Sequence, residues 1–346
     1  MDKRIVFAVA GSGKTSLIID RLNLENPSLI VTYTKNNLSN LRNKITNKFG
    51  CIPSNIRLYS YFEFLHSFCY RPFLALEIGA KGINWNIPPA YTMRIRRDKL
   101  AYYLDSGRRL YYNRIAKLLE QKNLLEEINL RIEKYFSCLF IDEVQDFAGH
   151  DFNFLSSLCQ ANIETVLVGD YYQHTFDTSR DGNVNASLHN DYEKYVNRFR
   201  RMGLHVDNET LIRSYRCSPD VCNFISDKIG IEIRSHRDDN TIVKLIEDEA
   251  SIDEIYKCDR TVKLFYDSHY KYSCYSQNWG PAKGEDHYAD VCVVLNQSTY
   301  RLWKSDNLHQ LNPKTKNKFY VACSRARGNL FFIPESALKQ CITKKD

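Results

Sequence analysis

Two adjacent carboxylates, Asp142 and Glu143, directly follow a short apolar run that ends at Ile141. Such a run is typical of a strand buried on both faces of a parallel sheet, whose carboxyl end opens onto the ligand crevice. At that position one acid can hold Mg²⁺ while its neighbour polarises an attacking water molecule. The alternative is a buried strand that ends in an ordinary polar turn, because short motifs also occur by chance.

A second chemical signature lies near the start of the chain, where an apolar run over residues 5–9 precedes Ala-Gly-Ser-Gly-Lys-Thr and a helical pattern. The spacing matches a phosphate-binding loop, with Ala8 at the position usually occupied by glycine. The two glycines let backbone N–H groups face a phosphate, and the helix adds the positive end of its dipole. The alternative is a Gly/Ser turn that caps an ordinary helix. We predict a nucleoside triphosphate site made by Ala10, Gly11, Ser12, Gly13, Lys14 and Thr15, with Thr15 and Asp142 as Mg²⁺ ligands.

The elements that must position these motifs form two series of expected strands. The first series covers residues 5–9, 29–32, 56–59, 138–141 and 165–168, and helical patterns separate its members. The second covers 241–246, 261–265, 290–295 and 330–333, with helices expected over 219–229 and 314–325. This alternation predicts an α/β fold with parallel sheets.

Residues 61–134 interrupt the first series with a helical stretch that lacks strand signals, and we interpret it as an inserted subdomain. Its basic residues alternate with tyrosines, and two interpretations remain open. One is a solvated helical face. The other is a nucleic-acid rim in which arginines meet phosphates and tyrosines stack on bases. The residues concerned are Arg94, Arg96, Arg97, Lys99, Arg108 and Arg109, with Tyr102, Tyr103, Tyr111 and Tyr112.

Composition sets broad limits on function. The 346 residues are 43% hydrophobic, enough for two cores, and the net charge of +7 suits a polyanionic partner modestly. The 11 cysteines are scattered singly, which favours reduced thiols over a zinc site or a disulfide framework. No segment approaches the ~20 apolar residues that span a bilayer. We therefore expect a cytoplasmic protein without a membrane partner.

Four further segments, 166–173, 210–218, 280–295 and 320–327, complete an ordered set of motifs. Together with the two above, they resemble the superfamily 1 helicases of the UvrD/Rep type over nearly the whole chain. The resemblance implies two RecA-like parallel-sheet domains with an ATP cleft between them and a helical insertion in the first. The domain boundaries it implies are 1–60 with 135–208 for the first domain, 61–134 for the insertion and 209–346 for the second domain.

The same resemblance implies roles for individual residues. Glu143 would be the catalytic base, Gln173 the sensor of the γ-phosphate, and Arg216 and Arg325 two arginine fingers. Tyr215 would stack on adenine and Asp286 would contact the ribose. The strand of nucleic acid would follow Thr32, Tyr33, Thr34, Lys35, Asn36, Ser60, Phe62, Phe176 and Lys283. For each residue a plainer role stays open, since an arginine can cap a helix and a tyrosine can fill a core.

Departures from the family shape the functional hypothesis. The chain starts at Met1, immediately before the first strand, so the glutamine that reads adenine in the family has no counterpart. Only residues 217–282 separate Arg216 from Lys283, where processive relatives carry a large subdomain. We expect a compact ATP- and Mg²⁺-dependent single-stranded DNA translocase or helicase, with RNA not excluded, in DNA repair or anti-phage defence.

Other functions remain to be weighed. Such a compact chain is expected to work beside a nuclease, similar to the helicase-like subunit of Gabija-type anti-phage systems. The alternative is a nucleic-acid-gated ATPase switch that regulates the nuclease without processive unwinding. A kinase built on the same loop is disfavoured by Gln173, Arg216 and Arg325, because a kinase would need an acceptor-binding lid.

Overall fold

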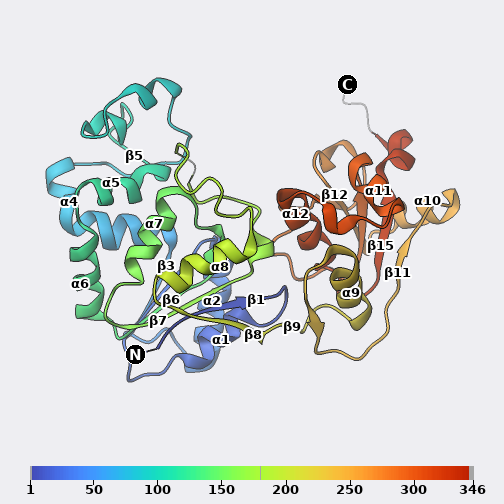
Figure 1. Cartoon of the computed structure of the whole chain (residues 1–346), viewed down its shortest axis with the longest axis horizontal. Helices are drawn as coiled ribbons and strands as arrows, with labels where there is room; N and C mark the ends of the chain where they lie inside the picture. The colour runs from blue at the N-terminus through green and yellow to red at the C-terminus, as the bar shows by residue number, and fades with distance from the viewer. Residues whose placement is uncertain (1, 180, 343–346) are drawn as a thin grey trace. The chain divides into compact units, whose positions relative to one another are not determined.

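The computed structural model describes residues 2–179 and 181–342, which form two compact units (Figure 1). Unit 1 comprises Met1–Val6, Thr15–Gly169 and Phe176–Asp207. Unit 2 comprises Phe7–Lys14, Asp170–Thr175 and Asn208–Asp346. The predicted phosphate loop therefore groups with unit 2, because Val9 and Ala10 pack into the hydrophobic core of that unit.

Unit 1 is built on a six-stranded sheet with the order β3-β2-β6-β7-β1-β8. Its strands are β1 (Lys3–Ala8), β2 (Ser28–Thr32), β3 (Ile56–Ser60), β6 (Cys138–Ile141), β7 (Glu164–Gly169) and β8 (His205–Leu211). The pairs β3–β2, β2–β6 and β6–β7 are parallel, and β2 and β6 are buried along their whole length. Continuous apolar strands of this kind need cover on both faces of the sheet, which helices supply.

The helices of unit 1 follow the strands in the order expected for an α/β fold. They are α1 (Lys14–Arg21), α2 (Lys35–Phe49), α3 (Tyr61–Glu63), α4 (Arg71–Ile78), α5 (Ile115–Gln121), α6 (Leu125–Tyr135), α7 (Gly149–Leu158) and α8 (Tyr192–Arg201). A π-helical turn, Phe64–Tyr70, joins α3 to α4. Thr34 caps α2 by accepting a hydrogen bond from the Asn37 N–H at 3.1 Å, and Gly50 ends that helix in a left-handed conformation.

The stretch 61–134 was expected to lack strands, and the structure corrects this in part. A short parallel pair, β4 (Ile83–Asn84) with β5 (Leu110–Tyr111), closes the loop between α4 and α5 (teal in Figure 1). Each strand has only two residues, too few to produce an alternating apolar pattern in the sequence.

Unit 2 contains a five-stranded parallel sheet with the order β11-β15-β14-β12-β13. The strands are β11 (Val243–Leu245), β12 (Thr261–Phe265), β13 (Ser276–Asn278), β14 (Asp290–Leu295) and β15 (Leu330–Pro334). A separate parallel pair joins β9 (Arg213–Ser214) to β10 (Arg234–Ser235). The helices are α9 (Pro219–Phe224), α10 (Glu249–Lys257), α11 (Gln297–Lys304) and α12 (Pro313–Cys323).

The predicted fold class is confirmed, and every strand expected from the sequence has a counterpart. The strands that were missed are mostly polar edge strands. β8 carries exposed Asn208, Glu209 and Thr210, and β13 reads Ser-Gln-Asn, so neither shows an apolar run. Cysteines of the described residues are free thiols, mostly buried. No described helix has both the length and the apolar character needed to cross a bilayer.

Candidate nucleotide site and strand-binding segments

The carboxylate pair lies in unit 1 at the carboxyl end of β6, as its sequence predicted. Asp142 and Glu143 are 2% and 7% exposed. The Asp142 N–H donates to the Val31 carbonyl at 2.9 Å, which carries the β2–β6 ladder one residue past the strand. Asp142 Oδ2 accepts from the Thr32 hydroxyl at 3.4 Å, and Oδ1 accepts from the Glu143 N–H at 3.0 Å. The acid is therefore fixed at the sheet edge.

Glu143 stands in a backbone conformation that non-glycine residues seldom adopt, with φ 58° and ψ 40°. Its carboxylate accepts hydrogen bonds from the Asn37 amide at 3.0 Å and from the Gln145 amide. The turn fits tightly under the end of β7, where a Cβ on Gly169 would lie 2.5 Å from both Gln145 Oε1 and Val144 Cγ1. Backbone strain at a residue whose buried carboxylate accepts two hydrogen bonds is typical of a functional position.

The phosphate loop in unit 2 curls against the segment that carries Tyr215 and Arg216. The Gly11 carbonyl accepts from the Tyr215 N–H at 2.9 Å, and Gly11 has φ 71°. A Cβ at Gly11 would lie 2.6 Å from Arg216 Cβ, so only glycine fits there. The first N–H groups of α1, from Lys14 onward, have no partner within the helix and can face an anion.

Two loop groups are engaged by protein neighbours. The Ala10 N–H donates to the Tyr320 hydroxyl at 2.8 Å, and that hydroxyl donates to Asp170 Oδ2 at 3.0 Å. Ser12 bonds back to the Val9 carbonyl through its hydroxyl at 2.8 Å. Burial raises the pKa of Tyr320 well above its usual value, so the hydroxyl keeps its proton. Tyr320, which the sequence did not single out, thus positions the loop.

Both predicted arginine fingers are buried in unit 2. Arg216 donates to the Ser324 carbonyl at 3.1 Å and forms an ion pair with Asp286, whereas its buried Nε has no partner among the described residues. Arg325 donates to the Glu285 carbonyl at 3.0 Å and lies 3.9 Å from Asp286. Burial, together with the charge of Arg216, lowers the pKa of Arg325 to about 10, so it stays cationic at neutral pH.

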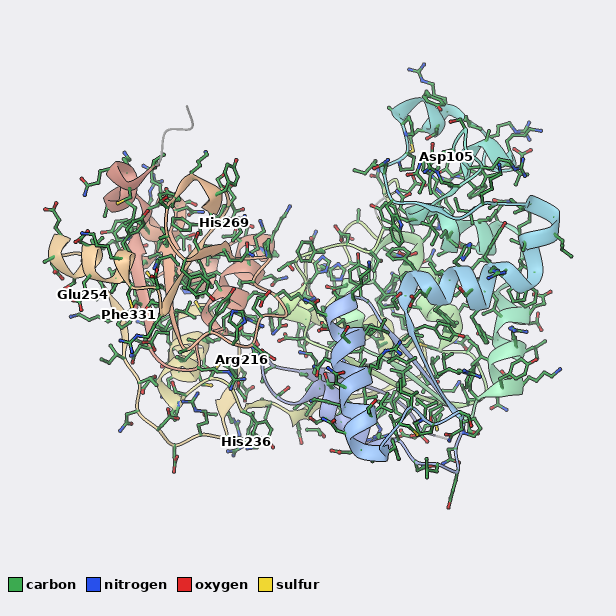
Figure 2. The ribbon with its side chains drawn as sticks, turned by 180° about the vertical axis from the view of Figure 1, so that it is seen from behind. Asp105, Arg216, His236, Glu254, His269 and Phe331 are labelled. Carbon is green, nitrogen blue, oxygen red and sulfur yellow. The ribbon has the colours of Figure 1, made fainter. Side chains whose placement is uncertain are left out.

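An exposed aromatic pair stands next to these arginines. Tyr215 is 61% exposed, and its ring stacks on His236 with centroids 3.9 Å apart and planes 11° apart. The segments of Arg216 and His236 lie side by side in unit 2 (Figure 2), since the His236 N–H donates to the Ser214 carbonyl at 2.9 Å. His236 carries no sequence signal of its own, and only the β9–β10 pairing brings it to Tyr215.

The segment that contains Gln173 is held by α12. Gln173 is 4% exposed, and its N–H donates to the Asp170 carbonyl at 2.9 Å. The Asn317 amide donates to the His174 carbonyl at 3.1 Å, beside the Tyr320–Asp170 bond. A conformational change at residues 170–175 would therefore disturb these bonds to α12, and Arg325 follows that helix closely in the sequence.

The predicted strand-binding residues are partly brought together in unit 1. Thr32 and Ser60 are register partners at the ends of β2 and β3. Tyr33 lies against Phe62 with centroids 6.1 Å apart, although Phe62 is only 8% exposed. Thr34 caps α2, and Ser60 donates to Glu63 at 2.8 Å, so both also serve the local fold. Lys35, Asn36 and Phe176 are exposed, whereas Lys283 belongs to unit 2.

The tyrosines of the insertion do not form a stacking surface as a set. Tyr102, Tyr103 and Tyr111 are at most 3% exposed, so they are core residues. Arg108 bonds to the Ile78 carbonyl and Arg109 to Asp105 (labelled in Figure 2). Of the expected basic rim, Arg94 and Arg97 remain exposed without an ion pair among the described residues.

Comparison with known proteins then places the chain. The family described as viral superfamily 1 RNA helicase core domain matches residues 116–334, well over half of the chain. The chain belongs to this family. Helicase cores are NTP-hydrolysing enzymes, which agrees with the predicted enzyme class. The matched range begins after the phosphate loop and includes Asp142, Glu143, Gln173, Arg216 and Arg325.

One solved helicase structure shares this fold, and two others are similar at lower scores. The structure entitled "Crystal structure of Arterivirus nonstructural protein 10 (helicase)" is 12% identical, with a TM-score of 0.51 over 99% of this chain and 62% of that one. The PRRSV helicase structure is 13% identical, with a TM-score of 0.46, and the match covers 98% of this chain and 54% of that one. The structure of an Arterivirus nonstructural protein 10 complex with DNA is 14% identical, with a TM-score of 0.49, and the match covers 97% of this chain and 61% of that one. The chain thus spans less than two thirds of each. No curated protein matches it.

Proposed function

We propose that this helicase core hydrolyses ATP and couples hydrolysis to movement along, or release of, a single strand of nucleic acid. The observation that carries the proposal is the buried Nε of Arg216, which has no partner among the described residues and sits where the phosphate loop bends at Gly11. A buried guanidinium donor without an acceptor is costly, and an anion at the loop would satisfy it.

Different residues of the chain take the separate steps of ATP binding and hydrolysis in this proposal. Lys14 and the first N–H groups of α1 bind the β- and γ-phosphates, and Tyr215 offers its ring to the base. Thr15 and Asp142 are suited to hold Mg²⁺, which would neutralise phosphate charge when bound. Glu143 accepts a proton from the attacking water, in a carboxylate orientation set by Asn37 and Gln145. Arg216 and Arg325 stabilise charge that develops in the transition state.

Gln173 is the residue that links phosphate state to strand binding in this proposal. It lies between Asp170 and His174, both of which α12 contacts. The strand follows Thr32 to Asn36, then Ser60 and Phe62, with Phe176 and Lys283 as further contacts and Asp286 near the ribose. Movement requires that the affinity for the strand differ between nucleotide states, because a strand bound equally well in both states cannot shift the equilibrium between them.

Several finer parts stay hypotheses. DNA is the strand expected from the UvrD/Rep resemblance, whereas the description of the matching family names RNA, so both are candidates. A nuclease partner, as in Gabija-type defence, would turn the chain into a nucleic-acid-gated switch. Co-purification of a nuclease, with hydrolysis but no strand displacement, would favour that second function.

Steady-state ATP hydrolysis in Mg²⁺, with and without single-stranded DNA or RNA, tests the proposal. We expect turnover to rise at least about tenfold with a strand, and Lys14→Ala to abolish it. Displacement of a labelled strand from a tailed duplex then separates a motor from a switch. Hydrolysis unaffected by either strand would contradict coupling, and no hydrolysis would contradict the ATPase assignment.

A further inference from the structure

Trp85 is the exposed end of a cluster of aromatic rings in unit 1. Its ring is 61% exposed. It meets Phe62 edge-on at 5.1 Å between centroids and at 90°, and it lies nearly parallel to Tyr112 at 6.0 Å and 26°. Phe62 in turn contacts Tyr33 at 6.1 Å. The Trp85 ring is therefore held in place on two sides and left mostly open to solvent, where a ligand can reach it.

The rings connect Trp85 to the segment expected to bind the strand. Tyr33 belongs to the segment Thr32–Asn36, and Phe62 was itself expected on the track, although it is buried. Phe62 therefore cannot offer a ring face, but it can fix the ring that does. Tyr102, Tyr103 and Tyr111 are excluded from this role by burial, whereas Tyr91 is exposed and Tyr112 is partly buried. Of the exposed rings, Trp85 is the one that contacts Phe62.

The chain that follows Trp85 supplies the complementary charge. Arg94 and Arg97 follow Trp85 along the chain, and both are exposed with no ion pair among the described residues. Aromatic rings beside unpaired cations are the combination that binds single strands without sequence preference, because rings stack on bases and arginines meet phosphates. A protein partner would explain the apolar ring but not the two exposed guanidinium groups that follow it in the sequence.

We infer that Trp85 is a base-stacking residue that extends the strand-binding site from residues 32–36 onto the insertion. The ligand class is single-stranded nucleic acid, DNA or RNA. This inference rests on the proposed function, since it names a further contact of the same strand.

Fluorescence gives a direct test on the full chain. Trp85 is one of three tryptophans; Trp279 is fully buried and Trp303 packs on Phe332 at 4.4 Å between centroids. The emission difference between wild type and Trp85→Phe reports Trp85 alone. We expect an oligo-dT or oligo-U strand to quench this difference at the concentrations that stimulate ATP hydrolysis.

Substitutions separate stacking from simple apolar contact. Trp85→Ala should weaken strand affinity roughly 5- to 100-fold, the range for one stacked base, whereas Trp85→Tyr should restore most of it. Trp85→Leu should behave like alanine. The matched control is Tyr135→Ala, another exposed ring of unit 1 (47%), which should leave affinity unchanged. Thermal unfolding of each variant checks that the insertion stays folded.

The outcomes distinguish the inference from the proposed function. If wild type binds a strand and Trp85→Ala binds it equally well, Trp85 is not a stacking residue and a protein partner becomes the better occupant. If Trp85→Leu retains affinity, the contact is apolar and stacking is wrong. If wild type binds neither DNA nor RNA, the proposed function fails, and this inference fails with it.

Discussion

The geometry of Glu143 allows a specific prediction about its proposed role as the catalytic base. Its left-handed backbone and two amide partners orient a carboxylate that, as base, must accept a proton from water. Glu143→Gln keeps the shape but removes the basic oxygen. We expect ATP hydrolysis to fall at least about 100-fold, in keeping with the worth of general base catalysis, with little change in ATP affinity. Rapid-quench and nucleotide-binding assays measure the two separately, and substantial remaining turnover would show that another group is the base.

Tyr215 and His236 allow a prediction about base contact. The outer ring face of Tyr215 is available to a nucleobase, while His236 holds the ring from behind at 3.9 Å. Tyr215→Ala should raise the KM for ATP by roughly 5- to 100-fold, on the scale of one lost base–aromatic stack. His236→Ala should raise it less, and His236→Phe should be nearly neutral because a flat ring is kept. The KM values for ATP of the three variants provide the check; an unchanged KM in Tyr215→Ala would place the base elsewhere.

Asp151 predicts a pH dependence of stability. It is fully buried, and neither carboxylate oxygen has a partner among the described residues. Burial raises the pKa of Asp151 to about 7, only partly offset by nearby hydroxyls of Thr178, Tyr61 and Ser179. A raised pKa means that the stabilising contribution is complete below the unfolded pKa near 3.8 and is lost as pH rises toward 7.

Relative to Asp151→Asn, which does not titrate, wild type should therefore lose about 3 kcal/mol of unfolding free energy between pH 5 and pH 8. Urea unfolding of both proteins at the two pH values measures this difference. The same gap at both pH values would show that Asp151 is not titrating as its burial requires.

At the scale of elements, one buried ion cluster ties the helical insertion to the segment after β7. Asp181 accepts from Lys117 at 2.7 Å, from the Tyr102 hydroxyl at 2.6 Å and from Arg114 at 3.1 Å. Burial raises the pKa of Asp181, but these donors outweigh it and the pKa is lowered overall. The side chains of Arg114 and Lys117 are 1% and 4% exposed, so the carboxylate is their necessary counter-charge.

Asp181→Asn should destabilise the protein by about 3–5 kcal/mol, because it leaves two buried cations without an anion. Glu77→Gln, which removes an exposed partner of Lys122 on the same insertion, should cost less than about 1 kcal/mol. Chemical denaturation of the two variants gives the comparison. Similar small losses in both would mean that the insertion is not anchored through Asp181.

Local sequence patterns were enough to predict some elements of the site but not the residues that tertiary contacts bring to it. The strand before Asp142 and the loop before Lys14 are local apolar runs with fixed flanking residues, so their positions were predicted almost to the residue. Trp85, His236 and Asp181 lack a local pattern. Each acquires its neighbours only through pairing of distant segments, as Asp181 does with Lys117, 64 residues away. Tyr102, Tyr103 and Tyr111 were expected on the surface because they alternate with arginines, but that pattern does not show which side chains are buried.

In the whole molecule, nucleotide binding and strand binding must be linked if the chain is to act on a strand. Linkage is reciprocal: if a strand stimulates hydrolysis through tighter binding to one nucleotide state, that state must bind the strand differently. A chain that is a motor or a gated switch must satisfy this condition, whereas an unrelated ATPase with a basic surface need not.

The most direct measurement is therefore strand affinity in two nucleotide states. Glu143→Gln with ATP and Mg²⁺ holds the pre-hydrolysis state, and wild type with ADP gives the product state. Fluorescence anisotropy of a labelled single strand yields both Kd values at one salt concentration. We expect the two Kd values to differ by at least about tenfold, or about 1.4 kcal/mol of coupling. Equal affinities in the two states would contradict it.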